Sequence, residues 1–177
     1  MIERIMKRVD AGDAIAIHRI GCYYKYGRNR YPQDYNKALE HWHRSGELGC
    51  VEAFGSIGRA YINGDGVDFN KGKAEHYWEL AAIGGDLVAR HTLGIVEEQK
   101  GNVDRALKHH MIAVRDGDAP SLKNVKELYS KGHATKEDYT KALQLYQTYL
   151  GEIKSAQRDK AAADDGSYRF YENYRYY

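Results

Sequence analysis

The sequence has little cysteine and no long hydrophobic run. Its two cysteines, Cys22 and Cys50, allow at most one disulfide bridge, so a disulfide-rich secreted fold is excluded and reduced thiols are expected. Charged residues interrupt every apolar stretch in the first twenty residues, which predicts neither a secretory signal nor a membrane span there. We therefore expect an intracellular, cytoplasmic protein that has no membrane partner.

The sequence also lacks an excess of charge of one sign. Lys and Arg number 27 against 25 Asp and Glu, which leaves a net charge of +2. This balance gives no long-range field that would attract a nucleic-acid backbone or an anionic membrane. Phenylalanine is scarce, with three residues, and 29% of the residues are charged, so the core must be thin. A layer two helices thick suits this composition better than a compact globule.

What the sequence does contain is a pattern that recurs four times at a spacing of 32 to 37 residues. Self-similarity at this period is typical of stacked helix pairs, because one pair cannot bury its apolar face alone. The sequence therefore predicts a small helical solenoid whose function is binding. Each copy opens on a glycine and later carries a basic residue followed by Ala; these are Gly12, Gly49, Gly85 and Gly117, then Lys37-Ala38, Lys73-Ala74, Arg105-Ala106 and Lys141-Ala142.

These fixed points divide the chain into four repeats and two terminal parts. We expect a cap helix over 1–11, repeats over 12–48, 49–84, 85–116 and 117–149, a second cap helix over 150–166 and a Tyr-rich tail over 167–177.

Turn and cap residues predict where individual helices begin and end. In repeat two, helices are expected over 51–63 and 70–83, with Gly64 and Gly66 in a left-handed turn and Asp68 or Asn70 as the cap. Asn102 is expected to cap the second helix of repeat three. In repeat four, Thr135 and Asp138 have the spacing of a capping box.

Large aromatic residues recur at matched positions and are expected to fill the gaps between layers. The Tyr position holds Tyr24, Tyr61 and Tyr129, and the Trp position holds Trp42 and Trp78. In repeat three these positions hold Glu97 and His110, which predicts a more polar and weaker layer there.

The pattern is legible almost in full between residues 53 and 85, as A-x3-[LI]-G-x2-Y-x2-G-x-G-V-x5-K-A-x2-[YH]-W-x2-A-A-x2-G. It resembles the Sel-one-like repeat (SLR), a relative of the tetratricopeptide repeat (TPR). The resemblance covers about residues 12–149 and is degraded in the last two repeats, where Glu97 replaces the Tyr and Lys126 the Gly. It implies an all-α fold, a right-handed α/α superhelix of four helix-pair repeats with terminal cap helices. It also implies a non-enzymatic protein-binding scaffold or adaptor, with no cofactor.

The opening segment, residues 4–14, is similar to a junction in algal proteins of this family, where a zinc RING finger precedes the repeats. This chain lacks the Cys and His ligands of such a finger, so ubiquitin-ligase activity is not carried over to it.

By resemblance to tetratricopeptide repeats, certain positions on the first helix of each repeat face an inner groove. Their mixture of basic, polar and aromatic side chains suits an acidic peptide or protein, although an ordinary solvated face has the same composition. The candidate groove residues are His18, Cys22, Lys25, Tyr26, Arg59, Asn63, His91, Glu98, Gln99, Lys123, Glu127 and Lys131.

Three other functions fit the sequence less well. An RNA-binding helical repeat is an alternative, because the tail alternates Tyr with Arg, but acidic residues offset the basic ones there. A β-lactamase-like enzyme of this repeat family is a second, but no Ser-x-x-Lys occurs and a cysteine pair in each repeat is missing. A metal site is a third, but His41, His43, His109 and His110 lack ligand spacing and are expected to be structural.

Overall fold

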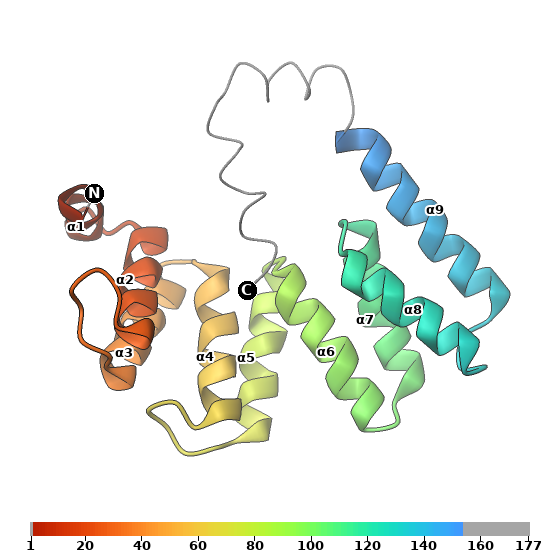
Figure 1. Ribbon diagram of the computed structural model, residues 1–177, viewed down its shortest axis with the longest axis horizontal. Coiled ribbons are helices and arrows are strands. Elements are labelled where there is room, and N and C mark those ends of the chain that lie inside the picture. The colour runs from red at the N-terminus through yellow and green to blue at the C-terminus, as the bar shows by residue number, and fades with distance from the viewer. Residues whose placement is uncertain (1, 154–177) are drawn as a thin grey trace. The chain divides into compact units, whose positions relative to one another are not determined.

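The computed structural model describes residues 2–153, and every regular element within this range is an α-helix (Figure 1). The helices are α1 (Ile2–Asp10), α2 (Ala14–Tyr26), α3 (Tyr35–Glu47), α4 (Val51–Asn63), α5 (Lys71–Ile83), α6 (Leu87–Gln99), α7 (Val103–Arg115), α8 (Ala119–Ser130) and α9 (Lys136–Ile153). None of them is long and apolar enough to cross a membrane.

The helix ends follow from local chemistry. The side chain of Asn70 accepts a hydrogen bond from the backbone N–H of Lys73, so Asn70 is the cap of α5, as one of the two sequence alternatives had it. Thr135 and Asp138 form the predicted capping box, with the Thr135 N–H 2.9 Å from the Asp138 carboxylate and the Asp138 N–H 3.1 Å from the Thr135 hydroxyl. The four opening glycines all have a positive φ, between 77° and 97°, a conformation that glycine adopts without steric cost.

The described part of the chain divides into two compact units between residues 109 and 110, inside α7. Each unit is described separately below.

In the first unit, the pairs α2–α3 and α4–α5 each pack through buried alanines and one buried tryptophan. Trp42 on α3 and Trp78 on α5 are buried, with 2% and 6% of their surface exposed. A Cβ atom added to Gly58 on α4 would lie 2.5 Å from the Trp78 Nε1, and one on Gly21 of α2 would lie 2.5 Å from the Trp42 Nε1. Each indole therefore packs directly on the backbone of the preceding helix.

The loop between α4 and α5 packs against the preceding repeat. Gly66 has φ +73°, and a Cβ there would lie 2.8 Å from the Cβ of Tyr35, at the beginning of α3. Consecutive repeats therefore meet through a loop as well as through their helices.

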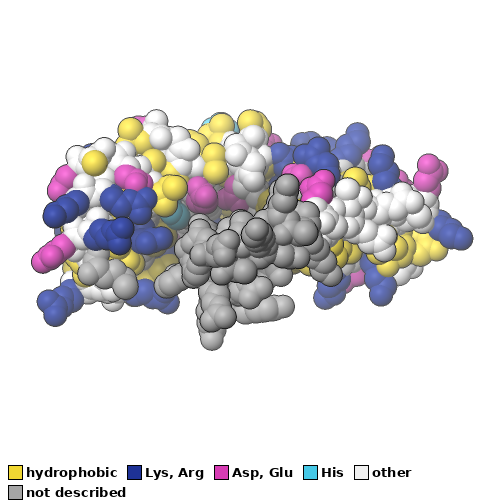
Figure 2. All heavy atoms as spheres, turned by 90° about the horizontal axis from the view of Figure 1, so that it is seen from above, with side chains coloured by type: hydrophobic (Ala, Val, Ile, Leu, Met, Phe, Trp, Pro, Cys, Tyr) yellow, Lys and Arg dark blue, Asp and Glu magenta, His cyan; other side chains and the backbone are white. Residues whose placement is uncertain are grey.

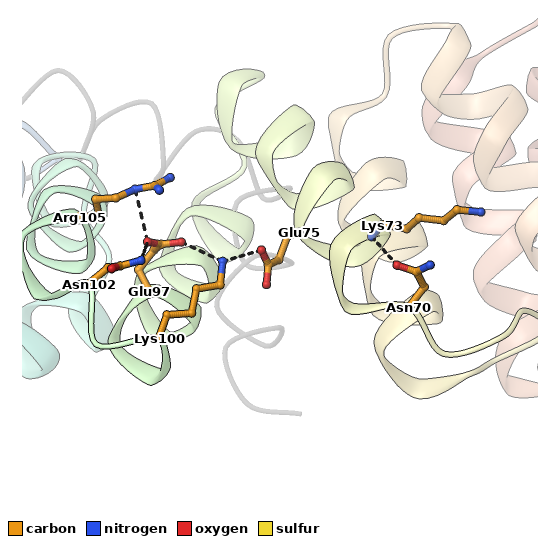
Figure 3. A network of polar contacts seen from close by, with 7 residues as sticks. All are labelled: Asn70, Lys73, Glu75, Glu97, Lys100, Asn102 and Arg105. Carbon is orange, nitrogen blue, oxygen red and sulfur yellow. Dashed lines mark hydrogen bonds and ion pairs between the residues drawn. The ribbon is translucent and has the colours of Figure 1, made fainter.

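The layer that begins repeat three is polar, as the sequence predicted, and whether it is weaker stays a prediction. Glu97 on α6 is buried, and its carboxylate accepts hydrogen bonds from Asn102 at 2.9 Å and Lys100 at 3.1 Å (Figure 3). Arg105 adds an ion pair at 3.3 Å, and Lys100 also reaches Glu75 on α5 at 2.6 Å. The Asn102 side chain was expected to cap α7. It donates to Glu97 instead, because a buried carboxylate without donors would be costly.

The second unit contains the end of α7, together with α8 and α9. His110 is fully buried at the position where the first two repeats have Trp, and its ring nitrogens lie 3.3 Å from the Ser121 hydroxyl and 3.3 Å from the Asn124 amide. Tyr149 packs over Gly117, whose φ is +96°. Helix α9 continues to Ile153, past the expected boundary at residue 149. The rest of the expected cap helix and the Tyr-rich tail lie outside the described residues.

Candidate peptide-binding surface

Nine of the twelve candidate groove residues lie on the first unit, on α2, α4 and α6, the first helices of the first three repeats. These helices are separated in sequence by the second helix of each pair. Side-chain contacts between α2 and α4 therefore decide whether the candidates share one surface.

His18 on α2 and Arg59 on α4 meet through a common partner. The His18 Nε2 lies 3.0 Å from the hydroxyl oxygen of Ser56, and the Arg59 guanidinium donates to the same oxygen at 3.4 Å. The Cys22 Sγ lies 3.7 Å from the His18 Nε2, one helical turn along α2. Ser56 is almost completely buried, so its hydroxyl lies beneath the His18 and Arg59 side chains that contact it.

Burial controls protonation at this point. Burial lowers the pKa of His18, and the charge of the nearby Arg59 lowers it further, although Glu52 and Asp86 oppose the shift. Burial also raises the pKa of the Cys22 thiol. Around neutral pH the His18 ring is therefore neutral and Cys22 is a thiol rather than a thiolate.

A second contact joins the other ends of the same two helices. The Lys25 ammonium lies 3.3 Å from the carboxylate of Asp65, in the turn after α4, and the Asn63 amide donates to that carboxylate at 3.3 Å. Lys25 also lies over the rings of Tyr26 and Trp42, 5.5 Å and 5.9 Å from their centroids. Only 14% of the Lys25 side chain is exposed, and the Asp65 carboxylate partly neutralises its charge. Tyr26 and Asn63, in contrast, are exposed.

The remaining candidates are further along the chain. On α6, His91 and Glu98 are half-buried and Gln99 is exposed. On the second unit, Lys123 and Glu127 form an ion pair of 3.8 Å within α8, and the exposed Lys131 is the residue after its last turn. These three residues belong to a separate compact unit, so the candidate surface is restricted to α2 and α4.

The sequence analysis missed the two residues that connect this surface, Ser56 and Asp65. Ser56 stands seven positions after Gly49, and the matched positions hold the polar residues Arg19, Thr92 and Asn124, so its polar recurrence was a visible signal. Asp65 was assigned only to a turn. Its ion pair with Lys25 crosses from one repeat to the next and has no local sequence signal.

Two of the histidines considered as metal ligands, His41 and His43, have aromatic partners. His41 stacks on Tyr24 with ring centroids 5.5 Å apart, and His43 meets Tyr77 edge-on at 5.8 Å. Within residues 2–153, no three His, Cys, Asp or Glu side chains lie close enough together to hold a metal ion. Cys22 and Cys50 are not bridged to each other.

Comparison with known proteins gives a consistent result. The family model of the Sel1 repeat matches residues 14–50, 56–86 and 127–148. A curated relative, the ERAD-associated E3 ubiquitin-protein ligase component HRD3B of Arabidopsis thaliana, is 31% identical over 103 residues, which are 58% of this chain and 16% of the relative. The chain thus spans a small part of that protein's length.

Two solved structures share the fold. A Sel1 repeat protein from Oxalobacter formigenes aligns with a TM-score of 0.72 at 25% identity, over 85% of this chain and 63% of the other. The protective antigen c5321 of uropathogenic Escherichia coli, which has an SLR fold, aligns with a TM-score of 0.71 at 24% identity, over 86% of this chain and 33% of the other. The solenoid fold expected from the repeats is confirmed.

Proposed function

The chain belongs to the Sel1 repeat family, and from this membership we propose that it is a non-enzymatic scaffold that binds a peptide or protein on its α2–α4 surface. Sel1 repeat proteins generally mediate protein–protein interactions, and the HRD3B relative is a component of a larger assembly by its name. The proposal includes an intracellular location, where the thiols of Cys22 and Cys50 stay reduced.

One observation supports this surface above others: side chains of two successive repeats meet there through Ser56 and Asp65. A surface assembled from two repeats is fixed by the packing of both, so a partner would meet preorganised groups. The exposed faces of single helices lack this property.

The charges support an acidic partner. Arg59 is exposed and has no carboxylate partner among the described residues, since its one recorded hydrogen bond is to Ser56. A guanidinium in this state is available for a bidentate contact with a carboxylate. The exposed Tyr26 ring and Asn63 amide lie on the same two helices and supply apolar contact and hydrogen bonding.

The test measures binding of a fluorescent peptide of about 12 residues with alternating Glu and Ala, a length of extended chain that would cross several helices. We expect Arg59→Glu to weaken binding at least tenfold, because it replaces an attractive charge by a repulsive one. Arg44→Glu is the matched control, since Arg44 is exposed on α3 away from this surface.

Circular dichroism should show unchanged helix content in both variants, because both arginines are exposed. Equal binding by the two variants would overturn the proposed surface. A Lys123→Glu variant measures separately whether α8 contributes to binding.

A further inference from the structure

Outside the α2–α4 contacts, a hollow of about 390 Å³ lies between the N-terminal helix α1 and α2. Its lining is Arg4, Ile5 and Arg8 from α1 and Arg19 from α2. Figure 2 shows Lys and Arg side chains gathered over the end of the first unit that α1 and α2 form. The side chains of three arginines and of the buried Ile5 therefore line one small space.

Two of these three arginines have no counter-charge. Arg4 and Arg19 are exposed and form no ion pair within residues 2–153. The Arg8 guanidinium lies 2.6 Å from the Asp13 carboxylate. That carboxylate also caps α2, because it accepts a hydrogen bond from the Ala16 N–H. The third guanidinium is thus preorganised by its partner.

This arrangement costs stability. Arg4 and Arg8 are one turn apart on α1, and like charges at this spacing repel each other. Arg19 adds a third positive charge to the same hollow. An anion bound there would relieve the repulsion. A role in ligand binding therefore explains the cluster better than a contribution to folding does.

We propose that this hollow binds the phosphate group of a phosphorylated side chain on a protein partner. The three arginines and Asp13 sum to a charge of +2, which matches the charge of a phosphorylated side chain, about −1.5 to −2 at pH 7. Planar guanidinium groups donate paired hydrogen bonds to phosphate oxygens. The apolar side chain of Ile5 contacts the methylene carbon that carries the phosphate.

The surroundings favour one compact anion over an extended polyanion. Glu3 and Asp10 are exposed on α1, and Asp13 pairs with Arg8. These carboxylates would repel the neighbouring phosphates of a nucleic acid or an anionic membrane. A single phosphorylated side chain avoids them.

The test is calorimetric titration of the full chain with a blocked pentapeptide, Ala-Ala-phosphoserine-Ala-Ala. We expect saturable binding of this peptide and none of the serine parent, and at least tenfold weaker binding by the Arg4→Gln/Arg19→Gln double variant. Arg44→Gln, an exposed arginine on α3, should bind like the wild type. The melting temperature and helix content of each variant establish that it is folded.

Three results would overturn the proposal. They are affinity of the folded double variant within twofold of the wild type, inorganic phosphate binding as tightly as the phosphopeptide, and displacement of the phosphopeptide by a lower concentration of a 12-nucleotide single-stranded RNA or of phosphatidylserine vesicles. Binding of the Glu-Ala peptide by the double variant is measured in parallel. It reports on the α2–α4 surface, so the two proposals can fail independently.

Discussion

Trp78 lies directly on the backbone of Gly58, with its indole Nε1 2.5 Å from the position that a Cβ on residue 58 would occupy. Gly21 and Trp42 repeat this relationship one helix pair earlier, at the same distance. The glycine in the Ile-Gly pair of each of these repeats is therefore required by the contact with an indole. Neither glycine has a positive φ, so backbone freedom is not the reason.

Gly58→Ala should lower the free energy of unfolding by about 1–3 kcal/mol, the usual cost of overpacking a core. The added methyl would meet both the buried Trp78 ring and, at 3.0 Å, the backbone oxygen of Ala74, and neither can move freely. Gly72→Ala is the control, because Gly72 is exposed on α5 and a Cβ there would meet only the Asn70 side chain, at an ordinary contact distance of 3.6 Å. That change should stabilise by about 0.5–1 kcal/mol through helix propensity. Urea unfolding of both variants measures the difference, and equal stabilities would contradict the packing described.

Trp78→Ala should cost about 3–5 kcal/mol, because it leaves a large cavity between α4 and α5. This loss is comparable to the whole stability margin of a small domain. Phe69→Ala removes another large aromatic, but one that is 65% exposed, and should change stability little. Thermal melting followed by circular dichroism distinguishes them. A Trp78→Ala melting temperature within a few degrees of wild type would show that the indole does not hold the pair together.

The pH dependence of stability should report on Glu97. Burial alone would raise the pKa of Glu97, but hydrogen bonds from Asn102 and Lys100 and the charges of Lys100 and Arg105 outweigh it and lower the pKa below 4.5. A carboxylate with a lowered pKa stabilises the folded state above its unfolded pKa, and this contribution is lost as pH falls through the folded value.

Glu97→Gln should therefore be less stable than wild type at pH 7, and the difference should shrink as the pH falls below 4.5. Glu40→Gln, at an exposed position on α3, is the control for the loss of one negative charge. Urea midpoints at a series of pH values provide the measurement. A constant difference between wild type and Glu97→Gln across the series would refute the assignment.

On the proposed function, Asp65 would compete with an acidic partner for Lys25, so Asp65→Asn should increase affinity for the Glu-Ala peptide. Removing the internal ion pair frees a cation, and an interaction of this partly exposed kind is worth about 0.2–1 kcal/mol, or up to about fivefold in affinity. Asp68→Asn removes an exposed carboxylate from the same loop and controls for net charge. An equal gain in both variants would attribute the effect to long-range charge alone.

The helices and their ends could be predicted from the sequence because their signals are local. Helix α4 has the expected bounds, and Asn70 and the Thr135–Asp138 pair act as the sequence indicated. The role of Asn102 could not be predicted, since its side chain serves a carboxylate whose burial depends on the packed structure.

The candidate surface was predicted only in part. Periodicity placed His18 and Arg59 on the first helices of their repeats, but the Ser56 hydroxyl that connects them depends on how two repeats pack. The division of the chain within α7 was likewise not foreseen, although the polar residues Glu97 and His110 mark the same repeat as different from the others. The division into four repeats stays a prediction, because the matched family segments leave out residues 87–126.

The close contact between Gly66 and Tyr35 bears on how such a chain can be shortened or lengthened by recombination. If repeat two were moved alone, with its boundaries at the opening glycines, its α4–α5 loop would lose the helix of the preceding repeat against which it packs. Exchange of whole segments would then require compatible residues at both places, a small residue at the loop tip and a side chain of suitable size at the start of the adjoining helix. Gene fusions within this family should accordingly preserve these two positions together.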